Sequence, residues 1–135
     1  MKEITVDAVI ENIDLVTGRI NEELEVLGCP EGTRAQIDVA IDEILSNIIR
    51  YAYPREAGSV TVRYDCADGM FSISFEDEGA QYNPLKKPDP DVSLPAEERK
   101  IGGLGVFLVK KTMDAVGYLR REDRNILTIR KKILL

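Results

Sequence analysis

The chain has 135 residues, of which 44% are hydrophobic and 31% are charged. This is enough for one compact α/β or α+β domain and too little for two ordinary ones. The formal net charge of -6 disfavours broad binding to a nucleic-acid backbone or to an anionic membrane surface. The sequence contains no histidine, which excludes histidine bases, histidine-ligated zinc and the Ser-His-Asp triad.

The two cysteines, Cys29 and Cys66, lie far apart and form no C-x-x-C motif, so we expect free thiols rather than a zinc or redox site. The first residues carry charges where a signal peptide would need an apolar segment. No stretch approaches the roughly 18 apolar residues of a membrane span. We therefore expect a cytoplasmic protein with a single domain over residues 1–135.

Apolar periodicity predicts a strand and then a helix at the start of the chain. Apolar and polar residues alternate over residues 4–10, as in a half-buried strand. Apolar residues then recur at steps of three and four until Gly28 and Pro30 end the helical pattern, a common helix stop. The stripe predicted for this helix consists of Ile13, Val16, Ile20, Leu24 and Leu27.

A second helix is predicted from about Thr33 to Tyr53. Thr33 and Gln36 have the spacing of a capping box, in which both side chains bind free backbone NH groups. Pro54 ends the helix, because proline cannot continue it. Its core stripe is predicted to contain Ile37, Ile41, Ile44, Ile48 and Ala52.

The second half of the chain reads as a hairpin, an irregular segment, a helix and two strands. Alternation on both sides of Asp68-Gly69 predicts a β-hairpin. Residues 80–101 break all periodicity and hold four of the six prolines, which is typical of a functional lid or a disordered segment. The glycine-rich stretch 102–105 opens a third helix that includes Ala115 and ends at Gly117, and two strands about a turn at 122–125 complete the chain.

Paired polar residues on the second helix and after the hairpin could carry chemistry. Glu43 and Asn47 share one helix face, away from the apolar stripe, although such a pair is most often a solvated surface. Asp77 and Gly79 follow the hairpin, where a carboxylate can accept a hydrogen bond from an exocyclic amine and a glycine lets a flat ring approach. The plainer interpretation of the second pair is an acidic turn.

Glycines at the start of the third helix are a further candidate feature. Gly103 and Gly105 would leave backbone NH groups free to bind an anion at the positive end of the helix. A hinge or close helix packing explains the same glycines, and their spacing fits neither a P-loop nor a Rossmann motif. The irregular segment between Asp77 and these glycines is then either a mobile lid or a linker.

The order of these motifs resembles the Bergerat-type ATP-binding fold of histidine kinases, gyrase and the anti-sigma factor serine kinases. The motifs are, in chain order, Glu43-x-x-x-Asn47, Asp77-x-Gly79 and Gly103-x-Gly105. Within that superfamily the chain looks most similar to the anti-sigma factor kinases, which are similarly short. The resemblance implies an α/β two-layer sandwich (α+β), with a mixed, mostly antiparallel sheet covered on one face by about three helices.

The resemblance also implies roles for individual residues. Asn47 would bind Mg²⁺ through its amide oxygen, and Glu43 would be the general base that takes a proton from a serine or threonine hydroxyl. Asp77 would bind the adenine amino group, and Gly79 would let the base enter. The remaining contacts would come from Gly103, Leu104 and Gly105 around the phosphates, and from Arg50, or Arg99 and Lys100, as neutralising charges.

Three positions depart from the pattern of that family. Gln81 stands where the adenine motif often has a second glycine, so the start of the lid is expected to be stiffer or differently shaped. Tyr51 stands where many relatives carry a histidine. A threonine that often supports the adenine site has no clear counterpart, and Asn125 is the candidate to replace it.

The function implied by the resemblance is a serine/threonine kinase that uses ATP, releases ADP and needs Mg²⁺. Its partners would be an anti-anti-sigma protein of the STAS type, which it phosphorylates, and a sigma factor, which it sequesters, with no direct nucleic-acid or membrane partner. Relatives of this kind commonly form homodimers. Retention of Glu43 favours an active kinase over the alternative, a nucleotide-gated module that binds a partner without phosphorylating it. A histidine-kinase catalytic domain acting in trans is disfavoured, because no phosphoacceptor helix pair precedes the motifs.

Overall fold

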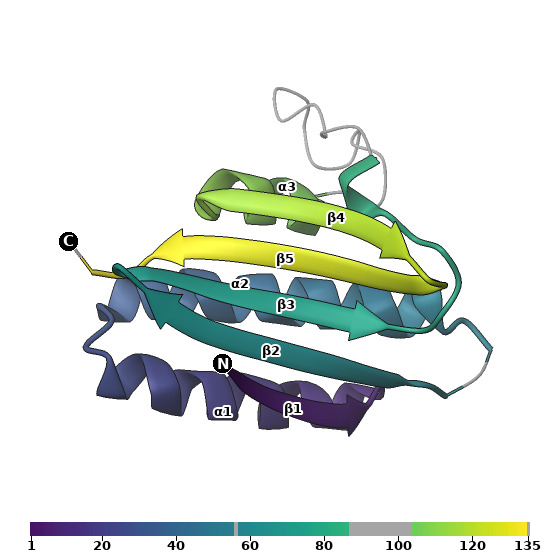
Figure 1. The fold of residues 1–135 in the computed structure, drawn as a ribbon, viewed down its shortest axis with the longest axis horizontal. Coiled ribbons are helices and arrows are strands. Elements are labelled where there is room, and N and C mark those ends of the chain that lie inside the picture. Colours follow the sequence, from purple (N-terminus) through teal and green to yellow (C-terminus); the bar gives the residue numbers. More distant parts are fainter. Residues whose placement is uncertain (56, 87–103, 135) are drawn as a thin grey trace.

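The computed structural model describes residues 1–55, 57–86 and 104–134, which form a sheet with helices packed on one face (Figure 1). The elements of the first half are β1 (Lys2–Asp7), η1 (Ile10–Asn12), α1 (Ile13–Val26), α2 (Glu31–Asn47), η2 (Ile48–Ala52) and β2 (Ser59–Ala67). Those of the second half are β3 (Met70–Asp77), η3 (Pro84–Lys86), α3 (Leu104–Thr112), β4 (Ala115–Arg121) and β5 (Arg124–Lys132).

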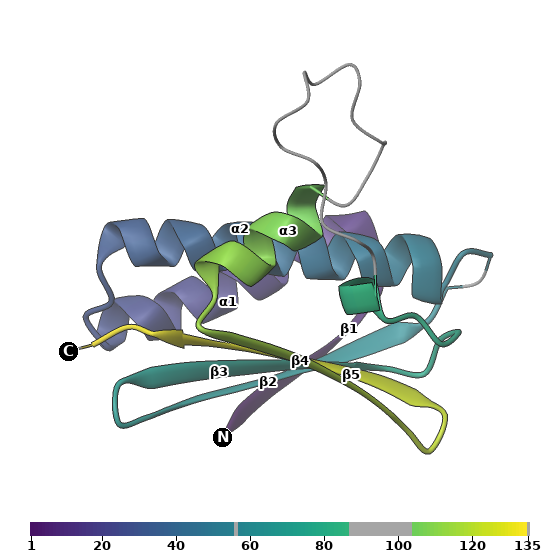
Figure 2. The same ribbon diagram turned by 90° about the horizontal axis from the view of Figure 1, so that it is seen from above.

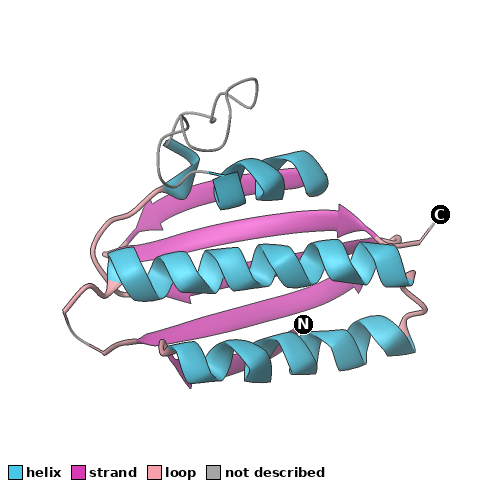
Figure 3. Cartoon of the chain, turned by 180° about the vertical axis from the view of Figure 1, so that it is seen from behind, coloured by secondary structure: helices cyan, strands magenta, loops and turns pink. Residues whose placement is uncertain are grey.

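The five strands in the described residues form one sheet in the order β1-β2-β3-β5-β4. All neighbouring strands run antiparallel, so the expected mixed sheet is antiparallel throughout this part of the chain. Figures 2 and 3 show α1, α2 and α3 on the same face of the sheet, with α2 between the other two. The expected two-layer α+β sandwich is confirmed.

The hydrophobic core lies between the helices and the inner face of the sheet. Both predicted helix stripes point into it, with Leu27 only partly buried. The predicted hairpin is confirmed as β2 and β3, which alternate between core and solvent and turn at Asp68-Gly69. Its fully buried side chains are Val60, Val62, Phe71, Ile73 and Phe75.

The first strand is shorter than its alternating pattern predicts. It ends at Asp7 rather than near Ile10, which is exposed and begins a short 3-10 turn. The side chain of Asn12 donates a hydrogen bond to the carbonyl of Asp7 at 2.9 Å, so it satisfies the strand end and redirects the chain into α1. Gly28 ends α1 as predicted, with a φ of +77° that an L side chain rarely adopts.

The predicted capping box at the start of the second helix is wrong. Helix α2 begins at Glu31, directly after Pro30, and the NH of Arg34 already donates to the carbonyl of Pro30 at 3.0 Å. Thr33 therefore lies inside the first turn and Gln36 is exposed. Glu31 favours this earlier start, because an acid in the first turn complements the positive helix end.

The predicted end of the third helix at Gly117 is also wrong. Helix α3 ends at Thr112, and both Ala115 and Gly117 belong to β4. The ammonium group of Lys131 donates to the carbonyl of Thr112 at 2.6 Å, so a side chain from β5 caps this helix in place of a local glycine. The NH of Asp114 then donates to the carbonyl of Arg130 at 2.9 Å, which starts the strand pairing.

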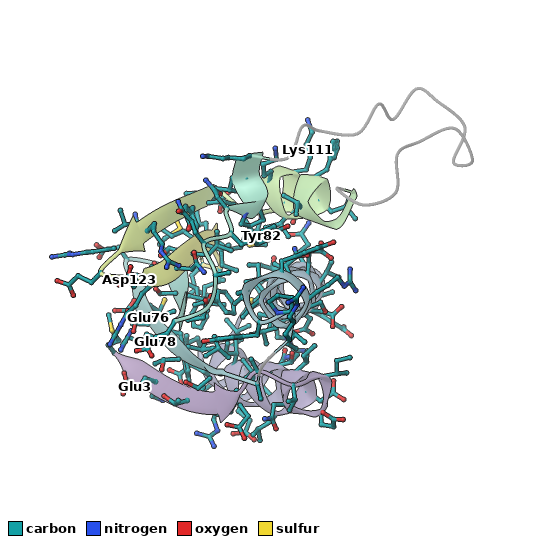
Figure 4. The ribbon with its side chains drawn as sticks, turned by 90° about the vertical axis from the view of Figure 1, so that its right-hand side faces the viewer. Glu3, Glu76, Glu78, Tyr82, Lys111 and Asp123 are labelled. Atoms are coloured by element: carbon teal, nitrogen blue, oxygen red, sulfur yellow. The ribbon has the colours of Figure 1, made fainter. Side chains whose placement is uncertain are left out.

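The outer face of the sheet is polar and open to solvent. Arg63 pairs with Glu3 at 2.9 Å and with Glu76 at 3.4 Å, and Arg124 pairs with Glu76 at 3.2 Å and with Glu78 at 3.0 Å. These contacts form a ladder of ion pairs across neighbouring strands. Figure 4 shows Glu3, Glu76 and Glu78 on the side of the sheet away from the helices.

Cys29 is buried, Cys66 is half-buried, and both are free thiols. No helix within the described ranges is long and apolar enough to cross a bilayer.

Two neighbouring positions on α2 test the packing of this helix. The side chain of Ile41 is 0% exposed, whereas that of Val39 is 53% exposed. Ile41→Ala should lower the free energy of unfolding by about 2–5 kcal/mol, since it removes a buried side chain and leaves a cavity. Val39→Ala should change it by no more than about 0.5 kcal/mol. Urea unfolding measures both, and equal losses would contradict the packing.

Candidate functional site

A pocket lies between α2 and the inner faces of β3, β5 and β4. It contains about 320 Å³ of free space, including its open mouth, and its apolar wall includes Ile44 and Phe75. The three buried polar side chains in the described part of the chain, Asn47, Asp77 and Asn125, all line it. Their exposed fractions are 5%, 3% and 4%. Because buried polar groups are costly without partners, their concentration here marks a candidate binding site.

Helix α2 supplies Glu43 and Asn47. The Nδ2 atom of Asn47 donates a hydrogen bond to Oε1 of Glu43 at 3.2 Å. The Oδ1 atom of Asn47 has no donor among the described residues and remains available as a ligand. Asn47 is buried, so the predicted placement of this pair on a face away from the core is wrong for Asn47, which lies where α2 faces the pocket.

The helix continues past Asn47 as the π-turn η2. The NH of Tyr53 donates to the carbonyl of Ile48, five residues earlier, at 3.1 Å. Such turns accommodate an extra residue and are frequent at functional sites. Here Ile48 and Ala52 both line the pocket. The helix ends next to Tyr53 as predicted, but the π-turn carries no sequence signal.

Asp77 ends β3 with one carboxylate oxygen satisfied and the other open. Its Oδ1 atom accepts hydrogen bonds from the NH of Gly79 and from Nδ2 of Asn125, both at 2.9 Å. No donor to Oδ2 is seen within the described ranges. Burial raises the pKa of Asp77 above its usual range, although Asn125, the NH of Gly79 and the nearby charge of Arg120 oppose this shift. The group is thus a buried carboxyl with one acceptor free for a ligand that donates.

The side-chain amide of Asn125 makes four hydrogen bonds in this part of the site. Besides Asp77, its Nδ2 donates to the carbonyl of Ala80 at 2.8 Å. Its Oδ1 accepts from the NH of Tyr82 at 3.2 Å and from the hydroxyl of Tyr118. The two donors and two acceptors of the amide are all used. The position predicted to replace the missing threonine therefore lies against Asp77.

Gly79 is required by close packing against the helix end. A Cβ atom at this position would lie 2.4 Å from the carbonyl oxygen of Ala52. The NH of Ala80 donates to the same carbonyl at 2.8 Å, and the guanidinium of Arg120 donates to the carbonyl of Gly79 at 2.9 Å. The structure thus gives Gly79 a packing role, whereas the sequence suggested access for a flat ring.

Gly105 brings the first turn of α3 against Glu43. A Cβ atom at position 105 would lie 2.2 Å from the Oε2 atom of Glu43, so only glycine allows this approach without moving the carboxylate. Leu104 is the first residue of α3. Gly103, Arg99 and Lys100, together with most of the predicted lid, lie outside the described residues.

Aromatic residues were the main part of this site that sequence reasoning missed. The rings of Tyr51 and Tyr82 stack with centroids 4.7 Å apart, and Tyr82 and Tyr118 line the pocket. The guanidinium of Arg50 lies 5.8 Å from the centroid of the Tyr51 ring. Arg50 is exposed and does not line the pocket, so this structure does not bring it to the other predicted residues.

The donor set suits a nucleotide that arrives with Mg²⁺. Asp77 offers a free acceptor beside an apolar wall, and Asn47 and Glu43 offer an amide and a carboxylate oxygen. The described residues contain no group of three or more His, Cys, Asp or Glu that could hold a metal alone. Mg²⁺ usually takes one or two protein ligands and completes its shell with water and phosphate, so the Oδ1 atom of Asn47 could hold it without such a group.

The sequence of the chain matches the profile of a known ATPase family. The profile of the histidine kinase-like ATPase domain covers residues 6–131 of the chain. The chain belongs to the histidine kinase-like ATPase family. The predicted resemblance to the Bergerat-type fold is confirmed.

Individual relatives of this ATPase-family chain support the narrower resemblance to anti-sigma factor kinases. A protein of Bacillus mycoides called serine-protein kinase RsbW is 30% identical over 93 residues, which cover 66% of this chain and 58% of that protein. A Bacillus cereus protein of the same name is 28% identical over the same share of each chain. The chain thus matches little more than half the length of these relatives.

Solved structures confirm the fold. The RsbU and RsbW domains of a Mycobacterium tuberculosis protein superpose with a TM-score of 0.68 at 20% identity, covering 98% of this chain and 31% of that one. The catalytic domain of the histidine kinase ThkA superposes with a TM-score of 0.51 at 13% identity, covering 98% and 97%.

The buried carboxyl of Asp77 predicts a pH-dependent difference in stability. In Asp77→Asn, Oδ1 keeps both of its donors, while an amide replaces the group whose ionisation burial penalises. Because burial raises the folded-state pKa above the usual 3.8, the Asp77 carboxyl lowers the stability of the wild type progressively as pH rises from below 3.8 through that higher pKa. The variant lacks this loss, so its stability relative to wild type should increase over the same window.

Urea unfolding at a series of pH values between 3 and 8 measures this difference. Val39→Ala, at an exposed position of α2 without an ionisable group, is the control and should show no such trend. A difference for Asp77→Asn that is constant with pH would contradict the assigned burial.

Proposed function

We propose that this chain is an anti-sigma regulatory kinase of the cytoplasm that transfers the γ-phosphate of Mg-ATP to a serine or threonine of a STAS-type anti-anti-sigma protein, and sequesters a sigma factor. The observation that carries the proposal is the convergence of Asn47, Asp77 and Asn125 on one pocket, with Glu43 accepting a hydrogen bond from Asn47. The names of the RsbW relatives support the choice of a serine kinase within the family.

The β3 side of the pocket suits the adenine. The free Oδ2 atom of Asp77 can accept a hydrogen bond from the exocyclic amino group of the base. Apolar side chains, including Phe75 and Leu127, can contact its faces. Asn125 holds Oδ1 and the backbone at Ala80, so the carboxylate is oriented before a ligand arrives, which reduces the entropy lost on binding.

The α2 side suits the phosphates and the transfer step. ATP would supply the reactive phosphoryl group, with Mg²⁺ to neutralise its charge. Asn47 would coordinate the metal through Oδ1. Glu43 would accept the proton of the incoming hydroxyl, since the hydrogen bond from Asn47 and the contact with Gly105 fix where its carboxylate lies. The start of α3 would face the phosphates with its free NH groups.

A second candidate is a nucleotide-gated module that binds its partner without phosphorylating it. The same hydrogen bond to Asn47 and the same contact with Gly105 favour it, because they give Glu43 a structural use that needs no proton transfer. Both candidates require nucleotide binding and differ only in phosphoryl transfer.

Glu43→Gln separates these two functions. The amide can still accept the hydrogen bond from Asn47 but cannot take up a proton. Transfer to the partner should fall by about 100-fold or more, as expected for loss of a general base, while the Kd for Mg-ADP should change less than about threefold. Radiolabelled ATP with an anti-anti-sigma protein measures the first, and calorimetry measures the second.

The matched control is Asp42→Asn, one residue away and exposed, which should leave both quantities unchanged. Normal transfer by Glu43→Gln would remove the assigned role of Glu43. A wild type that binds Mg-ADP but never labels a partner favours the binding module, and acid-labile label would indicate phosphohistidine. No binding of Mg-ADP at millimolar concentration would refute both candidates.

A further inference from the structure

Tyr53 joins the end of the second helix to the two strands that follow it. Its hydroxyl donates a hydrogen bond to the carbonyl of Ser59 at 2.9 Å. The same oxygen accepts a hydrogen bond from the backbone NH of Glu78, also at 2.9 Å. Glu78 follows Asp77 directly, so one side-chain oxygen connects the helix that carries Asn47 with the backbone that carries Asp77.

The hydrogen bond to Glu78 involves its backbone alone. The carboxylate of Glu78 pairs with Arg124 at 3.0 Å and lies on the side of the sheet away from the helices (Figure 4). The backbone NH is therefore the part of Glu78 that Tyr53 holds. A second, purely backbone link runs beside it, from the NH of Ala80 to the carbonyl of Ala52 at 2.8 Å.

The ring of Tyr53 packs directly against the backbone of Gly58. A Cβ atom on Gly58 would lie 2.1 Å from Cε1 of the tyrosine ring, so the ring rests directly on the glycine backbone. The carbonyl of Gly58 accepts a hydrogen bond from the NH of Ala8 at 2.7 Å, which links the backbone at Gly58 to the end of β1. The position of the hydroxyl is thus set by the sheet as well as by the helix.

The hydroxyl stays protonated under ordinary conditions. Burial raises the pKa of Tyr53 above its usual 10.0, and the hydrogen bond from Glu78 opposes this only in part. A protonated hydroxyl can donate to Ser59 while it accepts from Glu78. Both bonds therefore exist together at neutral pH.

We propose that Tyr53 is a positioning residue for the base-binding half of the site: its hydroxyl fixes the backbone at Glu78 and so sets where Asp77 lies relative to α2. The inference rests on the proposed binding of an adenine nucleotide. It adds a residue that lines no part of the pocket and acts only through Asp77.

The proposed role of Tyr53 concerns the contact between Asp77 and the base of the nucleotide, and not the contacts with the ribose or the phosphates. The carboxylate of Asp77 can contact a nucleotide only through a group that donates a hydrogen bond, which in adenine is the 6-amino group. Loss of the Tyr53 hydroxyl should therefore weaken ligands that carry this group. A ligand with the same ribose and phosphates but no 6-amino group should be indifferent to the change.

Tyr53→Phe tests the proposal, since it removes the hydroxyl and keeps the ring on Gly58. The Kd for Mg-ADP, measured by calorimetry, should rise about 5- to 50-fold, in line with the weakening of one hydrogen bond between the ligand and the carboxylate of Asp77. The Kd for purine riboside 5′-diphosphate with Mg²⁺, which lacks the 6-amino group, should change less than about twofold. Gly58→Ala displaces the ring while keeping the hydroxyl and should act in the same direction.

Tyr64→Phe is the matched control, because Tyr64 is buried on β2 against Phe71, with ring centroids 6.1 Å apart, and does not line the pocket. It should leave both Kd values unchanged.

Equal weakening of both ligands by Tyr53→Phe, or no weakening of Mg-ADP, overturns the positioning role while nucleotide binding stands. Failure of the wild type to bind Mg-ADP would instead refute the proposed function. Circular dichroism shows whether each variant is folded. If Tyr53→Phe does not fold, the two Kd values of Gly58→Ala test the positioning role instead.

Discussion

Burial of the Asp77 carboxyl is the constraint around which one end of this molecule is built. A buried carboxylate in a pocket that Phe75 and Leu127 also line loses most of its hydration, and such a group persists in a folded protein only where donors compensate it. The NH of Gly79 and the amide of Asn125 compensate one oxygen. The second oxygen, Oδ2, has no such donor among the described residues. Its burial therefore lowers the free energy of unfolding but leaves Oδ2 free to accept a hydrogen bond from a ligand.

Close approaches of backbone to neighbouring groups leave no room for added side chains at three glycines of the same region. Gly79 lies on the carbonyl of Ala52, Gly105 lies on the carboxylate of Glu43, and Gly58 lies under the ring of Tyr53. At each point a side chain on the glycine would force its neighbour to move. Rigid support of this kind keeps binding groups in place before a ligand arrives, which is consistent with a site built on a helix and on strand ends.

Sequence patterns predicted most of the architecture and the main polar residues of the site. Period and turn chemistry are local, so they identified the α1 and α2 stripes, the hairpin, and the acidic and glycine motifs. The end of α3 was missed because a distant residue decides it: Lys131 caps this helix in place of Gly117. The start of α2 was missed for a local reason, since the helix begins directly after Pro30 and before Thr33. The links made by Tyr53 and Asn125 depend on strand pairing, which periodicity does not reveal.

Asp77 and Asn125 face each other in the antiparallel register of β3 and β5, although 48 residues separate them in sequence. Closing a long loop costs more chain entropy than closing a short one, so this pairing is expected to form later in folding than the β2–β3 hairpin. The candidate site therefore exists only in chains that have completed the sheet through β5. A chain without β5 would hold Glu43, Asn47 and Asp77 but would lack Asn125 and Leu127, so the pocket is complete only when β5 lies beside β3.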